Sequence, residues 1–229
     1  MVAERLPADS DEREDLDTIT FASERARDLL QQILAFSRNQ VSVKKSIDLA
    51  AIVHKTLKML RVTVPESVQL VEDIVQVPPI QGDAGQLQRV IGNLVTNSLH
   101  AIGKRAGRVT VAVARAVEND AEDAFAAPRD AVVLSVADTG CGMDAATVER
   151  IFEPFYTTKR VGEGTGLGLS VVHGIIADHG GRIEVDSTRR KGTVFRIIMP
   201  VSAGDRASTA ASRRRHGGAV VTEAVVASL

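Results

Sequence analysis

The sequence lacks paired cysteines, long apolar runs and a net charge of either sign, and each shortage excludes a class of protein. Its one cysteine, Cys141, excludes an internal disulfide framework and a zinc site built from several thiols. No apolar run approaches the ~18 residues of a membrane span, and the N-terminus lacks the apolar stretch of a signal peptide. Lys and Arg number 28 against 29 Asp and Glu, so bulk charge does not favour nucleic acid. We expect a cytoplasmic protein without a membrane segment or a nucleic-acid partner.

The two ends of the chain differ from its middle in composition. Residues 1–15 are acidic with little apolar content, and residues 201–229 are rich in Ala, Ser, Arg and Gly, so we expect both segments to be disordered. Residues 45–200 mix strand-like and helix-like patterns, which predicts an α/β sandwich. The expected strands are 46–49, 68–74, 109–113, 132–136, 181–187 and 192–199, and the expected helices are 50–62, 84–103 and 169–179.

One further helix is predicted in front of this sandwich, over residues 16–38. Its apolar residues recur at alternating steps of three and four: Ile19, Ala22, Ala26, Leu29, Ile33 and Phe36. Because this is the spacing of a heptad seam, the helix should pack against another helix. A core helix of the same domain is the alternative interpretation.

The predicted helix that starts at residue 84 carries the first candidate site. Asp83 and Gln86 have the spacing of a capping box at its start. Asn93 and Asn97 lie one turn apart on its polar stripe. Two amide oxygens at that spacing suit a hard cation such as Mg²⁺, which keeps most of its waters. A solvated helix face is the alternative.

A second candidate site is the segment Asp138-Thr-Gly-Cys-Gly-Met, which follows an apolar strand directly. A carboxylate at a strand end can accept a hydrogen bond from an exocyclic amine such as that of adenine. The glycines Gly140 and Gly142 would let the backbone approach a flat ligand closely. A simple Asp-Thr-Gly turn is the alternative.

Two more segments follow in the chain. Residues 162–168 hold four glycines in seven positions and run into a predicted helix, which suits a phosphate cradle. They lack the Lys-Ser/Thr of a P-loop and follow no strand, so they are neither a P-loop nor a Rossmann turn; a linker is the alternative. Residues 152–159 hold three of the seven aromatics. This segment could seat a mobile lid with Lys159 near phosphates, or it could simply anchor a loop.

The order of these segments resembles a known family. Asn93-x-x-x-Asn97, Asp138-x-Gly-x-Gly, Phe152-Glu-Pro-Phe and Gly164-Thr-Gly-Leu-Gly-Leu are similar to the N, G1, F and G2 boxes of sensor histidine kinases. These kinases share an ATP-binding superfamily with gyrase, Hsp90 and MutL, and the resemblance covers about residues 16–200. It implies a Bergerat-type, two-layer α/β sandwich: a mixed sheet covered on one face by helices, with the nucleotide under a lid over about 143–167.

The resemblance also implies roles for individual residues. Asp138 would bind the adenine amine, and Asn97 would hold the Mg²⁺ that bridges the phosphates, with Asn93 beside it. Gly140 and Gly142 would shape the adenine site. Further candidates for nucleotide contacts are His100, Phe155, Thr158, Lys159, Gly164, Thr165, Gly166, Leu167 and Gly168. The candidate catalytic residues are Asn93, Asn97 and Lys159.

One position separates branches of this superfamily. By the resemblance, the ATP-hydrolysing members carry a Glu one turn before the magnesium Asn, as a base for water. Asn93 stands at that position here, and an amide cannot take up the proton. The sequence therefore favours a kinase over a hydrolysing chaperone or topoisomerase.

Residues 16–40 resemble the second helix of the family's dimerisation hairpin. The first helix of that hairpin should carry an acceptor histidine followed by Asp or Glu, and none of the five histidines has that neighbour: His54, His100, His173, His179 and His216. We therefore predict a kinase region that transfers the ATP γ-phosphate to a histidine outside this chain, and from there to a response regulator. A homodimer through the 16–38 helix is expected from the resemblance. The alternatives are a nucleotide-binding or partner-docking module without kinase activity, and a serine kinase of the same superfamily.

Overall fold

The computed structural model describes residues 12–13, 15–16, 18–20, 44–118, 129–159 and 164–201. Its strands are β1 (Lys45–Ile47), β2 (Val68–Ile74), β3 (Ile80–Gly82), β4 (Gly107–Glu118), β5 (Arg129–Asp138), β6 (Arg182–Thr188) and β7 (Gly192–Pro200). Its helices are α2 (Leu49–Leu60), the short 3₁₀ turn η2 (Arg61–Thr63), α3 (Ala84–Ile102), α4 (Ala145–Arg150) and α5 (Gly168–Asp178).

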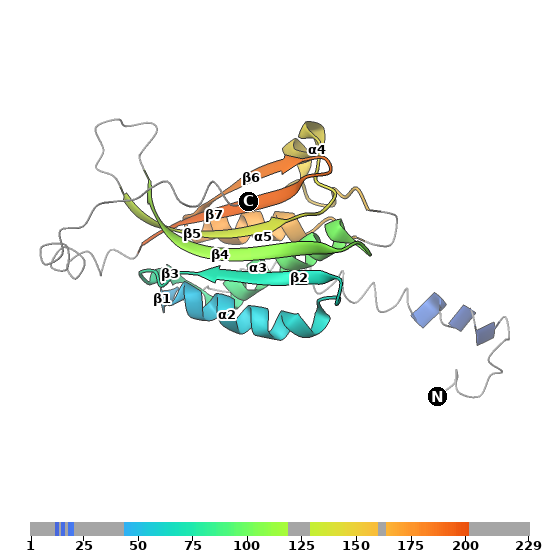
Figure 1. The fold of residues 1–229 in the computed structure, drawn as a ribbon, viewed down its shortest axis with the longest axis horizontal. Helices are drawn as coiled ribbons and strands as arrows, with labels where there is room; N and C mark the ends of the chain where they lie inside the picture. Colours follow the sequence, from blue (N-terminus) through green and yellow to red (C-terminus); the bar gives the residue numbers. More distant parts are fainter. Residues whose placement is uncertain are drawn as a thin grey trace, which may run out of the picture.

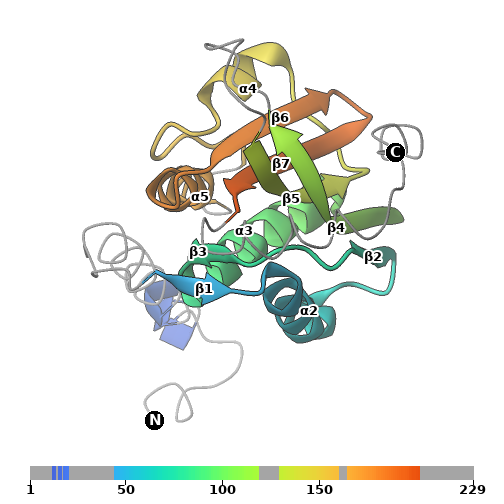
Figure 2. The same cartoon turned by 90° about the vertical axis from the view of Figure 1, so that its left-hand side faces the viewer.

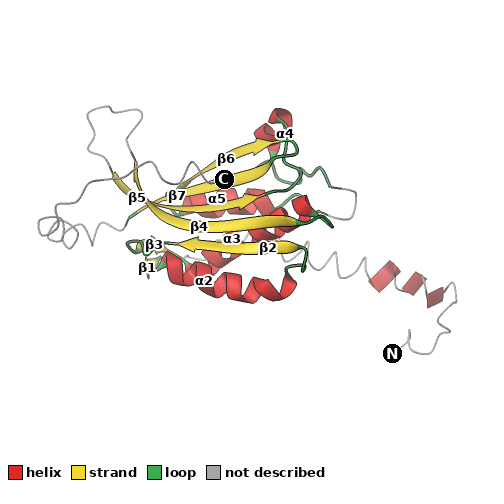
Figure 3. Ribbon diagram, viewed as in Figure 1, coloured by secondary structure: helices red, strands yellow, loops and turns green. Residues whose placement is uncertain are grey.

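A five-stranded mixed sheet forms one layer of the molecule (Figure 1). Its order is β2-β4-β5-β7-β6, and β2 pairs with β4 in parallel while every other pairing in the sheet is antiparallel. The strands β1 and β3 form a separate two-stranded ribbon. The helices α2, α3 and α5 lie on one side of the five-stranded sheet and form the second layer (Figures 2 and 3). The predicted two-layer sandwich is therefore confirmed.

The core lies between the two layers because strand residues alternate in burial. On β4, Val109, Val111 and Val113 are fully buried, and the residues between them lie on the other face. Helix α3 turns its own apolar face toward them, with Leu87, Ile91 and Leu94 at helical spacing. An apolar stripe that is buried in this way fixes how α3 is rotated, and so fixes where its polar stripe lies.

Several elements differ from the sequence-based expectation. The strands β4 and β5 are longer than expected and pair from Val109–Asp138 to Glu118–Arg129. The helix α4 was missed, although Asp144 caps it by accepting the Thr147 N–H at 2.8 Å. Residues 12, 13 and 15, which were expected to be disordered, are helical, so a helix begins before residue 16. Most of the expected 16–38 helix and the expected disordered tail from 202 lie outside the described residues.

Only one of the two bonds of the predicted capping box forms at the start of α3. The Asp83 carboxylate accepts the N–H groups of Gly85 and Gln86 at 2.8 and 3.0 Å. The Gln86 side chain makes no return bond, because the Asp83 N–H donates to His179 Nε2 at 2.9 Å. His179 therefore carries its proton on Nδ1, which donates to the Ile175 carbonyl at 2.7 Å. This buried histidine ties the end of α5 to the start of α3.

None of the described helices is long and apolar enough to cross a membrane.

Candidate functional site

The two asparagines of α3 meet the start of α5. The Asn93 amide Nδ2 donates to the Gly168 carbonyl at 3.4 Å. A Cβ placed on Gly168 would lie 3.8 Å from Asn93 Oδ1 and 4.0 Å from Asn97 Nδ2. The fold therefore brings Asn93, Asn97 and Gly168 together from segments about 70 positions apart.

The start of α5 differs from the starts of the other helices described. Aspartates cap α2, α3 and α4, namely Asp48, Asp83 and Asp144. The N-cap residue of α5 is Leu167, whose side chain cannot accept a hydrogen bond, and no side chain caps this helix. Its first N–H groups and the positive end of its dipole are thus available to an anion.

Asp138 lies at the other side of α3, at the end of β5. Its side chain is buried, with 8% of the residue exposed. The Gly140 N–H donates to its Oδ1 at 2.8 Å. Burial raises the pKa of the Asp138 carboxyl above its ordinary 3.8, although the Gly140 N–H, the Ser98 hydroxyl and the Thr193 N–H favour the charged form. A buried carboxyl with a raised pKa is a common mark of a functional site.

The two glycines after Asp138 lie so close to other protein atoms that a side chain would not fit at either position. A Cβ on Gly140 would lie 2.6 Å from Ala101 Cβ on α3, and the adjacent Cys141 N–H donates to the Ala101 carbonyl at 3.0 Å. Gly142 has a φ of 61°, and a Cβ there would overlap the Thr188 carbonyl. The sequence interpretation assigned both glycines to close approach of a ligand; in the structure they let this loop pack against α3 and the β6–β7 turn.

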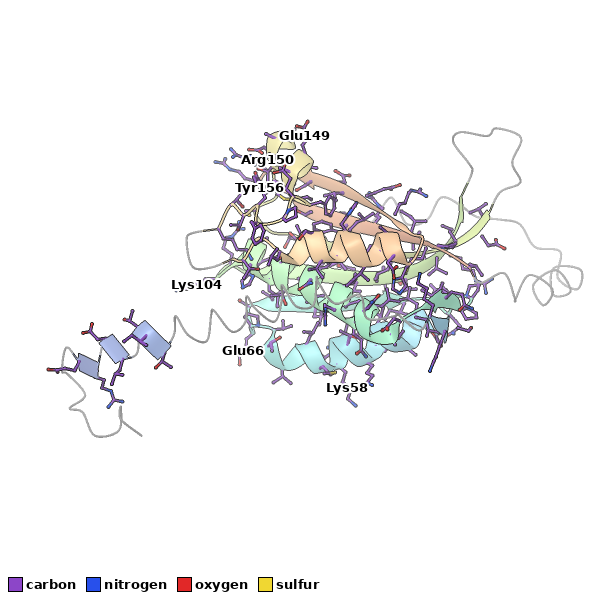
Figure 4. The ribbon with its side chains drawn as sticks, turned by 180° about the vertical axis from the view of Figure 1, so that it is seen from behind. Lys58, Glu66, Lys104, Glu149, Arg150 and Tyr156 are labelled. Atoms are coloured by element: carbon purple, nitrogen blue, oxygen red, sulfur yellow. The ribbon has the colours of Figure 1, made fainter. Side chains whose placement is uncertain are left out.

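The segment between α4 and α5 covers the same end of α3. Its Phe152 ring lies 5.1 Å from the His173 ring of α5 and packs on the core, so it anchors the segment. Lys159 Nζ lies 2.9 Å from His100 Nδ1, which joins the segment to α3. Figure 4 shows Arg150 and Tyr156 together at this end of the molecule, where the Arg150 guanidinium stacks 4.4 Å from the Tyr156 ring centre.

The remaining candidates from this segment have different surroundings. Phe155 is 65% exposed and has a φ of 68°, and its N–H donates to the Gly166 carbonyl at 3.0 Å. Thr158 is exposed, Gly164 and Thr165 are half-buried, and Leu167 is buried. Residues 160–163 lie outside the described part of the chain.

The geometry was tested against a nucleoside triphosphate with Mg²⁺. The base end offers a buried carboxyl acceptor and, beside it, the buried hydroxyl of Ser98, which favours the charged form of Asp138. The phosphate end offers the uncapped start of α5 and the amides of Asn93 and Asn97. Amide oxygens are suitable Mg²⁺ ligands, so the residues present fit the group at both ends.

Two residues near Asp138 were missed from the sequence. Ser98 is 1% exposed and follows Asn97 directly on α3. Thr193 is also buried and pairs with Asp138 across β5 and β7. A polar residue within the apolar face of α3 is a signal that could have identified Ser98; nothing in the local sequence marks Thr193, because only strand pairing places it there.

The raised pKa of Asp138 makes a prediction about stability. A raised folded-state pKa means that folding favours the protonated carboxyl. The stability that the protonated carboxyl contributes is fully present below the ordinary pKa, and it is lost as pH rises through the folded-state pKa. Asp138→Asn removes the charge, so we expect the variant to gain stability relative to the native sequence as pH rises above the ordinary pKa of 3.8. Urea unfolding across that range measures the difference; a gap that stays constant with pH would contradict the assignment.

Comparison with known proteins gives the family. Residues 82–203 match the family described as histidine kinase-, DNA gyrase B-, and HSP90-like ATPases. The chain belongs to this family of ATP-binding domains. It is 38% identical over 190 residues to the sensor kinase CckA of Brucella abortus, covering 81% of this chain and 20% of CckA. It is 32% identical over 204 residues to the sensor histidine kinase ZraS of Escherichia coli, and this match covers 87% of this chain and 40% of ZraS. The chain thus spans less than half the length of these relatives.

Solved structures show the same fold. The catalytic domain of histidine kinase ThkA is 26% identical with a TM-score of 0.56, over 71% of this chain and 99% of that domain. ThkA in complex with the response regulator TrrA gives a TM-score of 0.64 at 23% identity, and the match covers 88% of this chain and 55% of that chain. Full-length ShkA in complex with AMPPNP gives a TM-score of 0.64 at 22% identity, and the match covers 86% of this chain and 40% of that chain.

Proposed function

We propose that this chain is the ATP-binding catalytic region of a sensor histidine kinase. Residues 45–200 form the catalytic domain, and the 16–38 helix is half of a dimerising hairpin. The observation that carries the proposal is that α3 lies between two groups of polar residues, one at the start of α5 and one at the end of β5. One turn of α3 presents Asn93 and Asn97 to the start of α5, and Ser98 lies on its other side near Asp138. A nucleotide has the same two ends, a base and a chain of phosphates.

The base end is assigned to Asp138 and the loop after it. An ionised carboxyl accepts hydrogen bonds only, so it selects a base whose edge carries an amine. The Gly140 N–H holds Oδ1, which fixes the orientation of the carboxyl. This supports adenine as the base, with Gly140 and Gly142 bringing the loop close to α3.

The phosphate end is assigned to Asn93, Asn97 and the start of α5. Asn97 would hold Mg²⁺ with Asn93 beside it, and Mg²⁺ when bound neutralises charge on the phosphates. The N–H groups at Gly168 would hold phosphate oxygens, and Gly164, Thr165 and Gly166 would cover them. Lys159 and His100 are placed near each other at the edge of this end and would supply positive charge and a hydrogen-bonding ring.

The chemistry expected of this arrangement is positioning and charge neutralisation. Phosphoryl transfer needs little covalent help from the protein, and no carboxylate stands at position 93 to activate water. We therefore assign transfer of the γ-phosphate to a histidine supplied from outside these 229 residues, and then to a response regulator. The likeness to a histidine kinase bound to a response regulator supports that kind of partner.

Phosphotransfer in trans tests the proposal. The purified chain is mixed with a two-helix hairpin that carries a His-Asp or His-Glu pair, together with γ-labelled ATP and Mg²⁺. We expect acid-labile label on the hairpin, and a receiver domain should then remove it. Asn97→Ala should reduce the labelling rate by about 100-fold or more, because it removes the proposed metal ligand.

Thr96→Ala is the matched control, since Thr96 lies on the same helix but is exposed. It should label the hairpin at the native rate. Tight ATP binding without any label would favour the nucleotide-binding module instead. Label on serine, stable to acid, would favour a serine kinase.

A further inference from the structure

The five-stranded sheet has a second face, which none of the helices α2, α3 and α5 covers. All three lie on the side of the buried valines of β4 (Figures 1 and 2). On the central strands β4, β5 and β7, the alternate residues lie on the other face. Strand pairing brings six of them, all half-buried, into one block that we call the open face: Ala112, Ala114, Val133, Ser135, Val194 and Arg196.

The open face is more apolar than a solvated sheet face usually is. When one face of an antiparallel sheet lies in water, the residues on that face are mostly polar. Here most positions hold Ala or Val, and Val133 and Val194 belong neither to the hydrophobic core nor to the apolar residues packed against it. Apolar residues gathered on central strands outside the core are typical of a surface that another segment covers.

One charged side chain lies within the open face. Arg196 is half-buried on β7 and makes no hydrogen bond or ion pair with any residue that the structure describes. Its neighbour across the strands, Glu184, accepts a hydrogen bond from the Arg182 guanidinium at 3.0 Å. A half-buried guanidinium among apolar residues is therefore a position where a covering segment with a carboxylate would be stabilised.

The chain itself contains a segment with the matching composition. Eight of the eleven residues 219–229 are Ala, Val or Leu, and Glu223 carries the one charged side chain among them. Residues 202–218 differ, since they hold four arginines and no Val, Leu or Ile. Burial against an apolar surface would stabilise residues 219–229, and their one acid is complementary to the one base of the open face.

The point where this segment is joined to the sheet also suits the open face. Strand β7 ends at Pro200, and the next N–H, that of Val201, donates to the Asp130 carbonyl at 3.2 Å. Four residues of strand separate Pro200 from Arg196, which is about 13 Å. Residues 202–218 can span up to about 55 Å, so residues 219–229 can reach the open face of the same chain. Because the two are covalently joined, their effective concentration is high.

We propose that residues 219–229 bind the open face of their own sheet, with Glu223 paired to Arg196. This would add a third layer to the two-layer sandwich. The proposal does not depend on the nucleotide site, because the open face lies on the opposite side of the sheet from α3 and α5.

A spin label on the segment tests where it binds. The label is attached to Ser228→Cys in a chain that also carries Cys141→Ser, since Cys141 is the one native cysteine and is exposed. We expect the NMR methyl signals of the open face to lose at least half of their intensity. The matched control is the methyl groups of Val53 and Leu57 on α2, across the sheet, which should keep theirs. Equal intensity at both sets would overturn the proposal.

A mixed sample distinguishes the chain's own segment from that of a second copy. Spin-labelled chains without isotopes are mixed with isotope-enriched chains that carry no label. We expect the enriched chains to keep their open-face signals, because each open face is covered by its own segment. Loss as strong as in the single-chain sample would show that a second copy supplies the segment, and the proposal would be wrong.

Thermal unfolding measures what the contact contributes. Deleting residues 219–229 should lower the Tm by about 3–6 °C, and Glu223→Gln alone by about 1–3 °C. Arg196→Gln should lower the Tm by as much as Glu223→Gln, and the double variant should fall no further, because the two residues share one interaction. A native Tm for both the deletion and Glu223→Gln would contradict the proposal, and so would additive losses in the double variant.

The control for the charge is Asp205→Asn, which removes the other acid of residues 202–229 outside the apolar segment. It should unfold at the native Tm. A fall equal to that of Glu223→Gln would show a general charge effect and would remove the pairing with Arg196.

Discussion

Asp138→Asn is expected to abolish Mg-ATP binding while leaving the free domain at least as stable as the native one. An amide has one acceptor oxygen, which the Gly140 N–H would hold, so its N–H₂ donors would face the donor amine of adenine, where the carboxylate presents an acceptor. A site built to bond a specific group loses about 100-fold or more when that complementarity is lost. The free domain loses nothing comparable, because burial already penalises the charged carboxyl and raises its pKa.

Two measurements separate these effects. Calorimetry with Mg-ATP reports binding, and thermal unfolding without nucleotide reports the fold. Asp73→Asn is the matched control, since Asp73 is an exposed carboxylate on β2 and its loss should change neither quantity. Nucleotide binding by Asp138→Asn within a few-fold of native would remove Asp138 from the base site. A variant that fails to fold would show that its carboxyl is structural.

Gly142→Ala is expected to be the most destabilising change among the glycines of the site. The backbone at Gly142 has a φ of 61°, and an added Cβ would overlap the Thr188 carbonyl and lie 3.0 Å from the Gly192 oxygen. Both neighbours are backbone atoms of the β6–β7 turn, so they cannot rotate away as a flexible side chain would. Strain of this kind costs about 3 kcal/mol, which lowers the Tm by about 10 °C in a chain of this length.

Gly174→Ala is the control for this glycine effect. Gly174 lies in the middle of α5, and a Cβ there would meet no atom within 4 Å. Alanine is the better helix former, so this variant should be more stable by about 0.5–1 kcal/mol. Urea unfolding of both variants measures the pair. Equal stabilities would show that the β6–β7 turn moves aside without cost.

The long helices of the two-layer domain could be predicted from sequence. Helix α3 is predicted by the 3.6-residue recurrence of its apolar residues, and its ends by Asp83 and Gly103. Asn93, Asn97, Asp138 and Gly168 could be named as candidates, because short-range spacing and position after an apolar strand are properties of the sequence. Helix α4 was missed because six residues are too few to establish a period.

Pairings between distant segments could not be predicted. The sequence placed Gln86 as the partner of the Asp83 N–H, but His179, 96 positions away, takes that bond. The same holds for Ser98 and Thr193, which come near Asp138 only because α3 packs over β5 and because β5 pairs with β7. A local sequence pattern does not show which residue from a distant segment will accept a given N–H hydrogen bond in the folded chain.

By itself, then, the sequence determined the family of this protein, since four motifs in order resemble the boxes of sensor histidine kinases and the family match agrees. Only the tertiary structure decided how those motifs are supported. It showed that Gly140 and Gly142 are needed for backbone packing, that no side chain caps the start of α5, and that Ser98 is buried beside the Asp138 carboxyl. The physical reason is that the type of each residue is local, whereas burial and hydrogen-bond satisfaction depend on segments brought together by the core.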